Sequence, residues 1–481
     1  MVGRALKTPP SGDEWLPVRP PNKRASPSPA GALVSTQLVR FANYLRNEYE
    51  LCLDPRLDRR YQLLVKSHMG ISSSTAPGPN TGTDSTKAAS QSQAMWRFLH
   101  NDSVAIQALI EPLKEAARDG CSCSKSQFVL IMHDWSKLDF KTHKSKKDKV
   151  KLTHKHDVGY DLTASLAVDA SSGAPMAPVA MQLRTNKRLI NTMRKRSKLI
   201  AKHLDQIEPV MAEVADMKLA RTPVHIIDRE ADSLGHFRRW APQGHLMLIR
   251  CDDRRVKWNG ESILLSEIKE KLDSEYLYQD AGEALKDGKR VKRQVSEVAV
   301  VLDGIHRIRV KGVQKERTGI PLAMRAVFVR LLDHENYILA EWMLLTNVAG
   351  ELANSSTIGL WYYHRWKIES FFKLVKSAGQ QIECWQQSDG MAIMRRLLVG
   401  SMACVYVWRL LADESEEAAQ KREHLMKLSG RQTKRGVRAT ASGLLAGWYA
   451  LLSVLSLLES GTTVEQLRKY AQTHAPPGFF V

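Results

Sequence analysis

Two short apolar segments, each followed by an aspartate, constrain the fold of this chain most strongly. Residues 128–132 (Phe-Val-Leu-Ile-Met) lead into Asp134, and residues 224–227 (Val-His-Ile-Ile) end directly before Asp228. Short apolar runs of this kind are typical of buried strands. Because open α/β sheets bind ligands at the carboxyl ends of their strands, the pattern predicts site residues at Asp134 and Asp228. Asp139 is the rival of Asp134, which we prefer because it closes the apolar run.

Two further acids, Glu230 and Asp232, follow Asp228 closely. They lie in the turn into a helix that we predict for residues 233–240. The helix dipole favours acidic side chains at a helix N-terminus, which explains Glu230 and Asp232 without any chemistry. Asp228 comes too early for that explanation and is the better candidate for a site residue.

A third acid lies within residues 361–376, where Tyr362, Arg365, Glu369 and Lys376 follow one another at offsets of three, four and seven. At about 100° per residue, these offsets place the four side chains within about 60° of one another on a helix. One carboxylate beside two cations and a phenol suits a metal ligand next to a bound phosphate. Surface ion pairs are the alternative, and the spacing alone leaves both open.

The acids Asp134, Asp228 and Glu369 together indicate one kind of chemistry. Hard divalent cations prefer carboxylate oxygens, and Mg²⁺ is usually held by one or two carboxylates plus substrate phosphates. Two such ions about 3.5–4 Å apart stabilise both the attacking and the leaving oxygen of an in-line phosphoryl displacement. The three acids therefore predict metal-dependent phosphoryl transfer.

These motifs resemble those of the DDE transposases of bacterial insertion sequences, and more closely the insertion-sequence-four family with its transposon-five type of cut-and-paste enzyme. The four residues of segment 361–376 match the family signature Tyr-x2-Arg-x3-Glu-x6-Lys in full. Residues 228–232 (Asp-Arg-Glu-Ala-Asp) are similar to the second catalytic block, and residues 133–136 (His-Asp-Trp-Ser) stand where the first belongs. The resemblance covers most of residues 36–480.

The resemblance implies roles for eight residues. The acids Asp134, Asp228 and Glu369 would hold two Mg²⁺ ions, with Mn²⁺ as a substitute. Five others would contact DNA, by gripping a phosphate or by stacking on a base turned out of the helix: Tyr362, Arg365, Lys376, Arg250 and Trp342. A core tryptophan is the alternative for Trp342, and a strand-end arginine that only pairs with acids is the alternative for Arg250.

The resemblance also implies an α/β fold, with a ribonuclease-H-like catalytic core, a β-rich insertion and helical N- and C-terminal domains. The sequence pattern agrees, because three strands (the last two at 160–168 and 177–183) precede a helical stretch at 189–217 and the strand before Asp228. The expected domains are a disordered leader at 1–34, a helical DNA-binding domain at 35–120, a catalytic domain at 121–385 with its insertion at about 251–342, and a helical dimerisation domain at 386–481.

The composition points to an anionic partner. The chain of 481 residues has a formal net charge of +20, and nucleic acid is the simplest partner for it. Lysines and histidines cluster in residues 141–156, and smaller basic groups lie at 194–196, 254–255 and 289–293. A lone basic run is usually solvated surface, but several around an acidic site favour a channel for the DNA backbone. Such binding should weaken steeply with salt.

The resemblance implies a protein of the cytoplasm that acts on the bacterial nucleoid, and other features of the sequence lead us to expect no membrane partner. The six cysteines form no paired Cys-x-x-Cys pattern, so neither a structural zinc nor a redox motif is expected. No apolar run reaches the length of about 18 residues that a membrane span needs. The nearest, residues 444–458, is expected to be a buried or dimer-facing helix. Residues 1–30 show no signal peptide.

We therefore expect a homodimeric transposase that acts on double-stranded DNA, at terminal inverted repeats and at a target. Its steps would be end cleavage, hairpin formation and resolution, and strand transfer. One alternative is another metal nuclease, such as a resolvase or ribonuclease, which would not need the four-residue signature. The other is a domesticated or decayed transposase that only binds DNA. The sequence departs from the family in its basic 141–156 loop, its proline-rich leader and a spacing about one residue short between Trp342 and Tyr362.

Overall fold

A computed structural model describes residues 54–69, 85–154, 156–194, 203–286, 289–310, 313–431 and 439–474. The chain divides into two compact units. The first comprises Leu113–Lys137 and Val150–Phe372, and the second comprises the described residues up to Pro112, Leu138–Lys149 and those from Lys373 onward. The leader expected at 1–34 lies outside the described residues.

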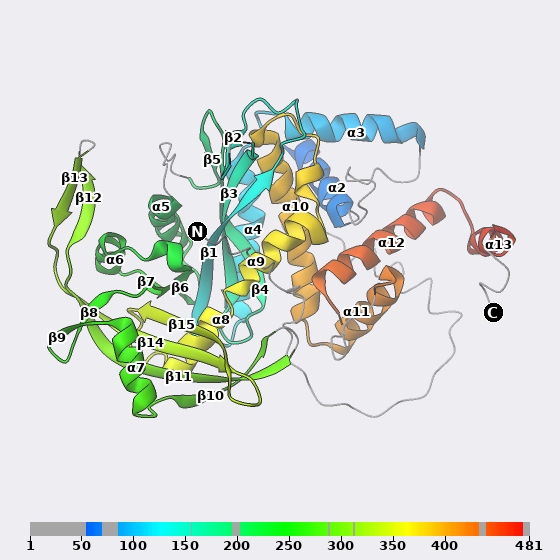
Figure 1. Cartoon of the computed structure of the whole chain (residues 1–481). Helices are drawn as coiled ribbons and strands as arrows, with labels where there is room; N and C mark the ends of the chain where they lie inside the picture. Colours follow the sequence, from blue (N-terminus) through cyan, green and yellow to red (C-terminus); the bar gives the residue numbers. More distant parts are fainter. Residues whose placement is uncertain are drawn as a thin grey trace. The chain divides into compact units, whose positions relative to one another are not determined.

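The first unit is built on one mixed sheet of thirteen strands (Figure 1). Its order is β5-β4-β3-β1-β6-β7-β15-β14-β11-β8-β9, with β2 paired to β3 and β10 paired to β11. The strands β1, β6 and β7 run parallel to one another. Its strands up to β7 are β1 (Phe128–Asp139), β2 (Val150–Lys151), β3 (Val158–Asp169), β4 (Pro175–Arg184), β5 (Leu189–Asn191), β6 (Thr222–Ile227) and β7 (Leu246–Arg250).

The strands after β7 extend the same sheet. Strand β15 returns antiparallel to β7, and β14 and β11 follow as long antiparallel neighbours. The strands are β8 (Arg255–Trp258), β9 (Glu261–Leu264), β10 (Gln279–Lys286), β11 (Lys289–Leu302), β14 (Leu322–Leu332) and β15 (Ile338–Thr346), with a separate hairpin of β12 (His306–Val310) and β13 (Val313–Arg317). This confirms the strands predicted between Arg250 and Trp342.

Two predictions around the central strands need correction. Strand β1 does not end at Asp134 but continues to Asp139, beyond the last residue that pairs with β6, His133. The stretch at 189–217 is not one helix: β5 pairs with β4, and helix α5 (His203–Asp216) begins later. The β6 strand and the helix after it, α6 (Leu234–Trp240), are confirmed.

Successive side chains along a strand point to opposite faces of the sheet, and each face packs against different elements. Phe328 belongs to a core that includes Ile207 of α5, Trp240 of α6 and Ile268 of α7 (Leu265–Ser274). Its neighbour on β14, Val329, points to the opposite face, because successive strand residues alternate. There it faces Gly359 of helix α8 (Ser355–Tyr363), where an added Cβ would lie 3.3 Å from Val329. A glycine thus lets α8 lie close against the sheet.

The signature segment does not form the continuous helix that its spacing predicts. Helix α8 ends at Tyr363, and α9 (Trp366–Lys373) begins after an interruption at His364 and Arg365. Leu374–Ala378 then forms a π-helical turn. Asn354 fixes the start of α8, because its side chain accepts a 2.9 Å hydrogen bond from the Thr357 backbone.

The second unit is helical, as predicted for both ends of the chain. Helix α10 packs against α2, α3, α11 and α12. The helices of this unit are α2 (Pro55–Met69), α3 (Ser85–Leu99), α10 (Gly390–Ala412), α11 (Glu416–Ser429), α12 (Ala441–Glu459) and α13 (Val464–His474), with α4 (Ile106–Cys123) shared between the units. Within the described residues, α10 and α12 are long and apolar enough to span a membrane, but 94% of the α10 segment is buried, as in a core helix; for α12 the share is 39%.

Candidate active site

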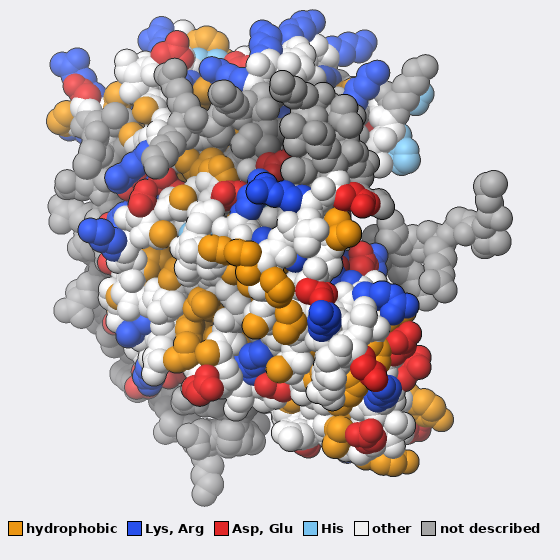
Figure 2. Space-filling view, turned by 90° about the vertical axis from the view of Figure 1, so that its left-hand side faces the viewer, with side chains coloured by type: hydrophobic (Ala, Val, Ile, Leu, Met, Phe, Trp, Pro, Cys, Tyr) orange, Lys and Arg blue, Asp and Glu red, His pale blue; other side chains and the backbone are white. Residues whose placement is uncertain are grey.

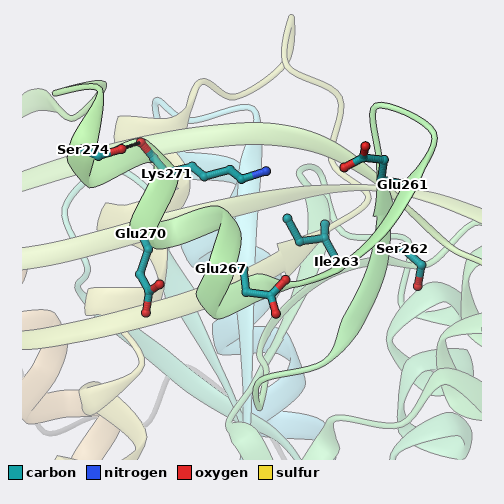
Figure 3. A pocket seen from close by; sticks show the side chains of 7 residues that line it. All are labelled: Glu261, Ser262, Ile263, Glu267, Glu270, Lys271 and Ser274. Atoms are coloured by element: carbon teal, nitrogen blue, oxygen red, sulfur yellow. Dashed lines mark hydrogen bonds between the residues drawn. The ribbon is translucent and has the colours of Figure 1, made fainter.

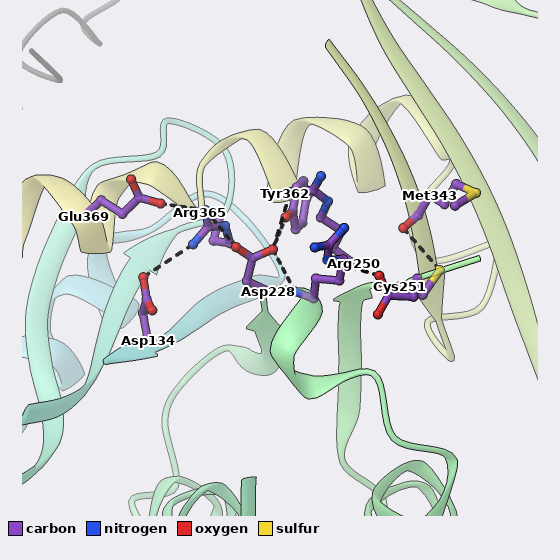
Figure 4. A network of polar contacts seen from close by, with 10 residues as sticks. Asp134, Asp228, Arg250, Cys251, Met343, Tyr362, Arg365 and Glu369 are labelled. Atoms are coloured by element: carbon purple, nitrogen blue, oxygen red, sulfur yellow. Dashed lines mark hydrogen bonds and ion pairs between the residues drawn. The ribbon is translucent and has the colours of Figure 1, made fainter. Parts of the chain in front are cut away.

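Three carboxylates from distant parts of the sequence meet at one guanidinium group (Figure 4). Nη2 of Arg365 lies 2.6 Å from Glu369 Oε1 and 3.3 Å from Asp228 Oδ2. Nη1 of the same side chain lies 3.4 Å from Asp134 Oδ2. The three acids predicted from the sequence are therefore brought together, and Arg365 is among them.

The sheet explains why Asp134 and Asp228 are neighbours. His133 of β1 and Ile227 of β6 form the last residue pair of the parallel ladder between these strands. Asp134 and Asp228 each follow directly in sequence, so the two carboxylates leave adjacent strands at the same level. Glu369 reaches them from α9. It lies four residues after Arg365, so the two side chains are i, i+4 neighbours.

Asp228 is the most heavily contacted of the three acids. Its Oδ1 accepts a 2.7 Å hydrogen bond from the Arg229 backbone and a 3.0 Å hydrogen bond from the Tyr362 hydroxyl. The guanidinium of Arg250, at the end of β7, approaches the same oxygen at 3.7 Å. Arg250 thus pairs with an acid, which agrees with the alternative that it is a strand-end arginine. However, 34% of its side chain is exposed and can contact a ligand.

Burial and the neighbouring charges separate the three carboxyl groups in pKa. Burial raises the pKa of Asp134 to about 6, even though Arg365 opposes the shift. Burial likewise raises the pKa of Glu369 against the attraction of Arg365. For Asp228 burial also acts upward, but Arg365 and the hydrogen bonds from Arg229 and Tyr362 outweigh it and lower its pKa. Asp228 is the acid held most firmly in its charged form.

The donor set suits a hard divalent cation, since it consists of carboxylate oxygens directed at one positive charge. In this structure that charge is the guanidinium of Arg365. Among the described residues no group of three or more His, Cys, Asp or Glu side chains stands ready to hold a metal ion, the three acids included. The three acids therefore suit a metal ion, because they offer carboxylate oxygens that converge on one point. A bound metal ion would replace Arg365 as the partner of these oxygens.

Trp342 and Tyr362 form an aromatic pair beside the acids. Their ring centroids are 5.3 Å apart in an edge-on arrangement. Trp342 is half-buried and packs against a small cluster around Ala284 and Leu331. It is neither a fully buried core tryptophan nor a free platform, and its part in DNA binding stays a prediction.

Lys376, the last residue of the signature, lies in the second unit. It belongs to the π-helical turn, and its Nζ pairs with Glu383 at 3.0 Å. The same Glu383 carboxylate accepts a 2.9 Å hydrogen bond from the backbone of Asp139, the rival candidate on β1. A π turn rotates less per residue about the helix axis than an α-helix does. Lys376 therefore does not lie on the one helix face that the spacing predicts for all four signature residues.

Asp232 has a structural role beyond the helix-dipole explanation. Its Oδ2 accepts a 2.9 Å hydrogen bond from the Asp252 backbone, and its Oδ1 pairs with Arg254 at 3.1 Å. These bonds tie the turn after Asp228 to the loop after Arg250. The Asp232 side chain is only 6% exposed, and a buried carboxylate is usually paired.

A buried histidine pair lies immediately behind the acids and was not predicted. His133 Nε2 and His225 Nδ1 are 2.9 Å apart, and His133 Nδ1 is 2.9 Å from Ser165 Oγ. Burial lowers the pKa of both rings, that of His133 to about 3. The pair therefore stays uncharged and supplies polar packing between β1 and β6. A histidine one residue before Asp134 and another three residues before Asp228 were the sequence signal.

Several residues of the basic runs are used inside the protein. Lys146 donates to the Trp385 backbone at 2.8 Å, and Lys149 donates to the backbone oxygens of Phe140 and His143. Arg293 is 5% exposed. On the face shown in Figure 2, the described residues carry basic, acidic and apolar side chains intermixed. The net charge thus does not map directly onto a single DNA-binding surface on that face.

A depression between β9 and α7 lies elsewhere in the first unit (Figure 3). It shares no residue with the acid cluster, and it is lined by Glu261, Ser262, Ile263, Glu267, Glu270, Lys271 and Ser274. Its glutamates would repel a phosphate backbone, so the acid cluster around Arg365 is the better candidate for the active site.

No protein-family model and no curated protein matches the chain. Among solved structures, it is similar to the piggyBac transposase in a cryo-EM synaptic complex with hairpin DNA. The two chains are 8% identical, the match covers 93% of this chain and 77% of that one, and the TM-score is 0.32. A TM-score this low does not establish a common fold, so the case for function rests on the residues of the site.

Proposed function

We propose that this protein is a DDE transposase of the cut-and-paste type, with Asp134, Asp228 and Glu369 as its catalytic acids. The observation that supports the proposal most is the convergence of these three carboxylates, from β1, β6 and α9, on Arg365 of the same four-residue signature. Surface ion pairing would not bring three acids from separate elements to one 4% exposed arginine.

The order of elements supports a ribonuclease-H-like core as part of the proposal. Three long strands (β1, β3 and β4), then α5 and then β6 follow the order expected for that fold, apart from the short strands β2 and β5. The parallel pairing of β1 with β6 puts two of the acids side by side. The strands from β8 to β14 would be the β-rich insertion.

The acids would hold two Mg²⁺ ions, or Mn²⁺ in their place. When bound, such ions lower the pKa of a water and stabilise charge on the oxygens of a phosphodiester. The protein's own residues prepare the site: Tyr362 and the Arg229 backbone fix the orientation of Asp228. Arg250 would meet a phosphate oxygen next to Asp228, and Arg365 another, because a guanidinium fork matches phosphate geometry.

The proposed reactions are all displacements at phosphorus, so one acidic site serves each of them. Water first hydrolyses the phosphodiester at the transposon end and leaves a 3′-hydroxyl. This hydroxyl attacks the opposite strand, which forms a hairpin and releases the flanking DNA, and a second water opens the hairpin. The regenerated 3′-hydroxyl then attacks target DNA. Trp342 and Tyr362 would receive the base displaced in the hairpin, Lys376 would grip a phosphate, and two protomers would act together in the cytoplasm.

The test is cleavage of a DNA that carries the element's own two ends, in Mg²⁺, by the wild type and by Asp228→Ala. The matched control is Asp303→Ala, because Asp303 pairs with Lys257 outside the acid cluster. We expect release of the flanking DNA by the wild type and the control but not by Asp228→Ala. Tight binding without cleavage by the wild type, in Mg²⁺ and in Mn²⁺, would instead support a protein that only binds DNA.

A further inference from the structure

Arg365 occupies the position at which the three acids converge. All polar contacts of its guanidinium within the described residues go to Asp134, Asp228 and Glu369, and its Nε is buried without a hydrogen-bond partner there. Its side chain is 5% exposed. The carboxylate oxygens that would face a metal ion therefore face a monovalent cation that belongs to the protein.

We propose that Arg365 is an internal counter-ion that blocks metal binding until DNA draws it away, so that metal loading is coupled to DNA binding. The inference rests on the proposed function and adds a mode of regulation to the same site. A guanidinium and a divalent ion carry like charges, and both would need the same oxygens of Asp228 and Glu369. Two like charges a few ångström apart in a partly buried site repel strongly.

The position of Arg365 in the chain lets its side chain exchange partners. It lies at the interruption between α8 and α9, where its backbone is fixed by a 3.0 Å bond to the Tyr362 oxygen and a 3.1 Å bond from the Ile368 amide. The side chain itself is fastened only through the acids and through ring contacts with Tyr362 and Trp366. A DNA phosphate offers the same guanidinium a bidentate partner. If the guanidinium moved to a DNA phosphate, three unpaired carboxylates would stay behind, and a divalent cation could neutralise them.

Arg250 shows by contrast why Arg365 is the blocking residue. Arg250 contacts Asp228 alone, at 3.7 Å, and 34% of its side chain is exposed. It can bind a phosphate without giving up a bridge between acids. Among the described residues Arg365 alone contacts all three acids, so its release frees the whole set.

The coupling can be measured by Mn²⁺ binding to the full-length protein, followed by electron paramagnetic resonance of the free ion, with and without duplex DNA. The variants are Arg365→Gln, Arg365→Lys and the control Arg239→Gln, which removes an arginine that pairs with Asp205 and Glu208 instead. Without DNA, Arg365→Gln should bind Mn²⁺ about tenfold more tightly than the wild type, within the usual range of coupling between sites. Arg365→Lys should lie between them, and Arg239→Gln should match the wild type.

Because coupling is reciprocal, duplex DNA should tighten Mn²⁺ binding to the wild type by a similar factor and should change Arg365→Gln little. Equal affinities for the wild type and Arg365→Gln, both weakened by Asp228→Asn, would overturn the counter-ion role and leave the proposed metal site intact. Absence of Mn²⁺ binding in every variant, with and without DNA, would overturn the metal site as well. Should Arg365→Gln fail to fold, an Arg365→Lys affinity equal to the wild type, or a wild-type affinity unchanged by DNA, would be the contradicting result.

Discussion

The Tyr362 hydroxyl donates a 3.0 Å hydrogen bond to Oδ1 of Asp228, a residue 134 positions earlier in the chain. This bond joins the helix that carries the signature to the strand end that carries the best-ionised acid. The Tyr362 hydroxyl therefore orients the Asp228 carboxylate, in addition to any contact that it makes with DNA.

The Tyr362→Phe variant should lose this orientation and keep the aromatic contact with Trp342. We expect a loss of about 0.5–1.5 kcal/mol in the free energy of unfolding, as for a typical hydrogen bond. We expect DNA cleavage to slow about tenfold or more, as when a group that orients a metal ligand is removed. Tyr363→Phe is the control, because its hydroxyl donates to the Leu285 backbone at 2.7 Å instead. Equal cleavage rates for the two variants would argue against an orienting role.

The raised pKa of Asp134 predicts a pH dependence of stability in the absence of metal. Burial raises this pKa from 3.8 to about 6, so the folded protein holds the proton over a pH range in which the unfolded chain has lost it. The contribution of Asp134 to stability is therefore present below pH 3.8 and is lost as the pH rises to about 6. Urea unfolding in EDTA at several pH values should show this loss in the wild type. Asp134→Asn should reduce it and leave the part due to Glu369, whose pKa burial also raises.

The opposite sign applies to Asp228. Because its pKa is lowered, its contribution is present above its ordinary pKa of 3.8 and is lost as the pH falls below that value. In Asp228→Asn this acid-side loss should disappear, while the loss between pH 3.8 and 6 due to Asp134 persists. An unchanged pH profile in either variant would contradict the assignment for that residue.

Asp232 and Glu230 offer a paired test of the loop clamp. Asp232→Ala should cost about 1–3 kcal/mol of stability, because it leaves Arg254 and the Asp252 amide without their partner. It should also slow cleavage, since the loop it holds directly follows Arg250 at the end of β7. Glu230 is exposed, and Glu230→Ala should change stability by no more than about 0.5 kcal/mol. Chemical denaturation of the two variants decides between a clamp and two equivalent surface acids.

Gly173 should not tolerate a side chain. Its φ of +69° is left-handed, and an added Cβ would collide with the His364 ring, next to Arg365 in sequence. Gly173→Ala should therefore cost about 1–3 kcal/mol. In the Gly173→Ala, His364→Ala double variant the collision is gone and only the backbone strain stays, so part of that cost should be recovered. No recovery in thermal melts would show that the ring contact does not matter.

The sequence predicted the acids because their local context is strong. An apolar run that stops at Asp228 marks a strand end whatever the rest of the fold, and β6 ends at Ile227 as expected. The β-rich character of residues 251–342 was expected from the family resemblance, and β8 to β14 lie there. Asp134 was found for a partly wrong reason, since β1 continues past it. Residues 135–139 form no apolar run, so nothing in the pattern indicated that the strand continues to Asp139.

The central position of Arg365 could not be predicted from spacing. Offsets of three, four and seven imply one face only if the helix is continuous, and this one is interrupted at His364 and widened at Leu374–Ala378. Neither departure is marked by a proline or another helix-breaking residue within residues 361–378, and Gly379 comes directly after the second one. The Asp232 clamp could not be predicted either, because it depends on the loop after β7.

The most direct measurement replaces Mg²⁺ with Fe²⁺ in the complex with DNA ends and maps where hydroxyl radicals, generated with ascorbate and peroxide, cut the protein chain. The account predicts cuts confined to three segments, around Asp134, Asp228 and Glu369, and their loss in Asp228→Asn. Cuts at other positions, or the same cuts in Asp228→Asn, would contradict the claim that these three acids form one metal site.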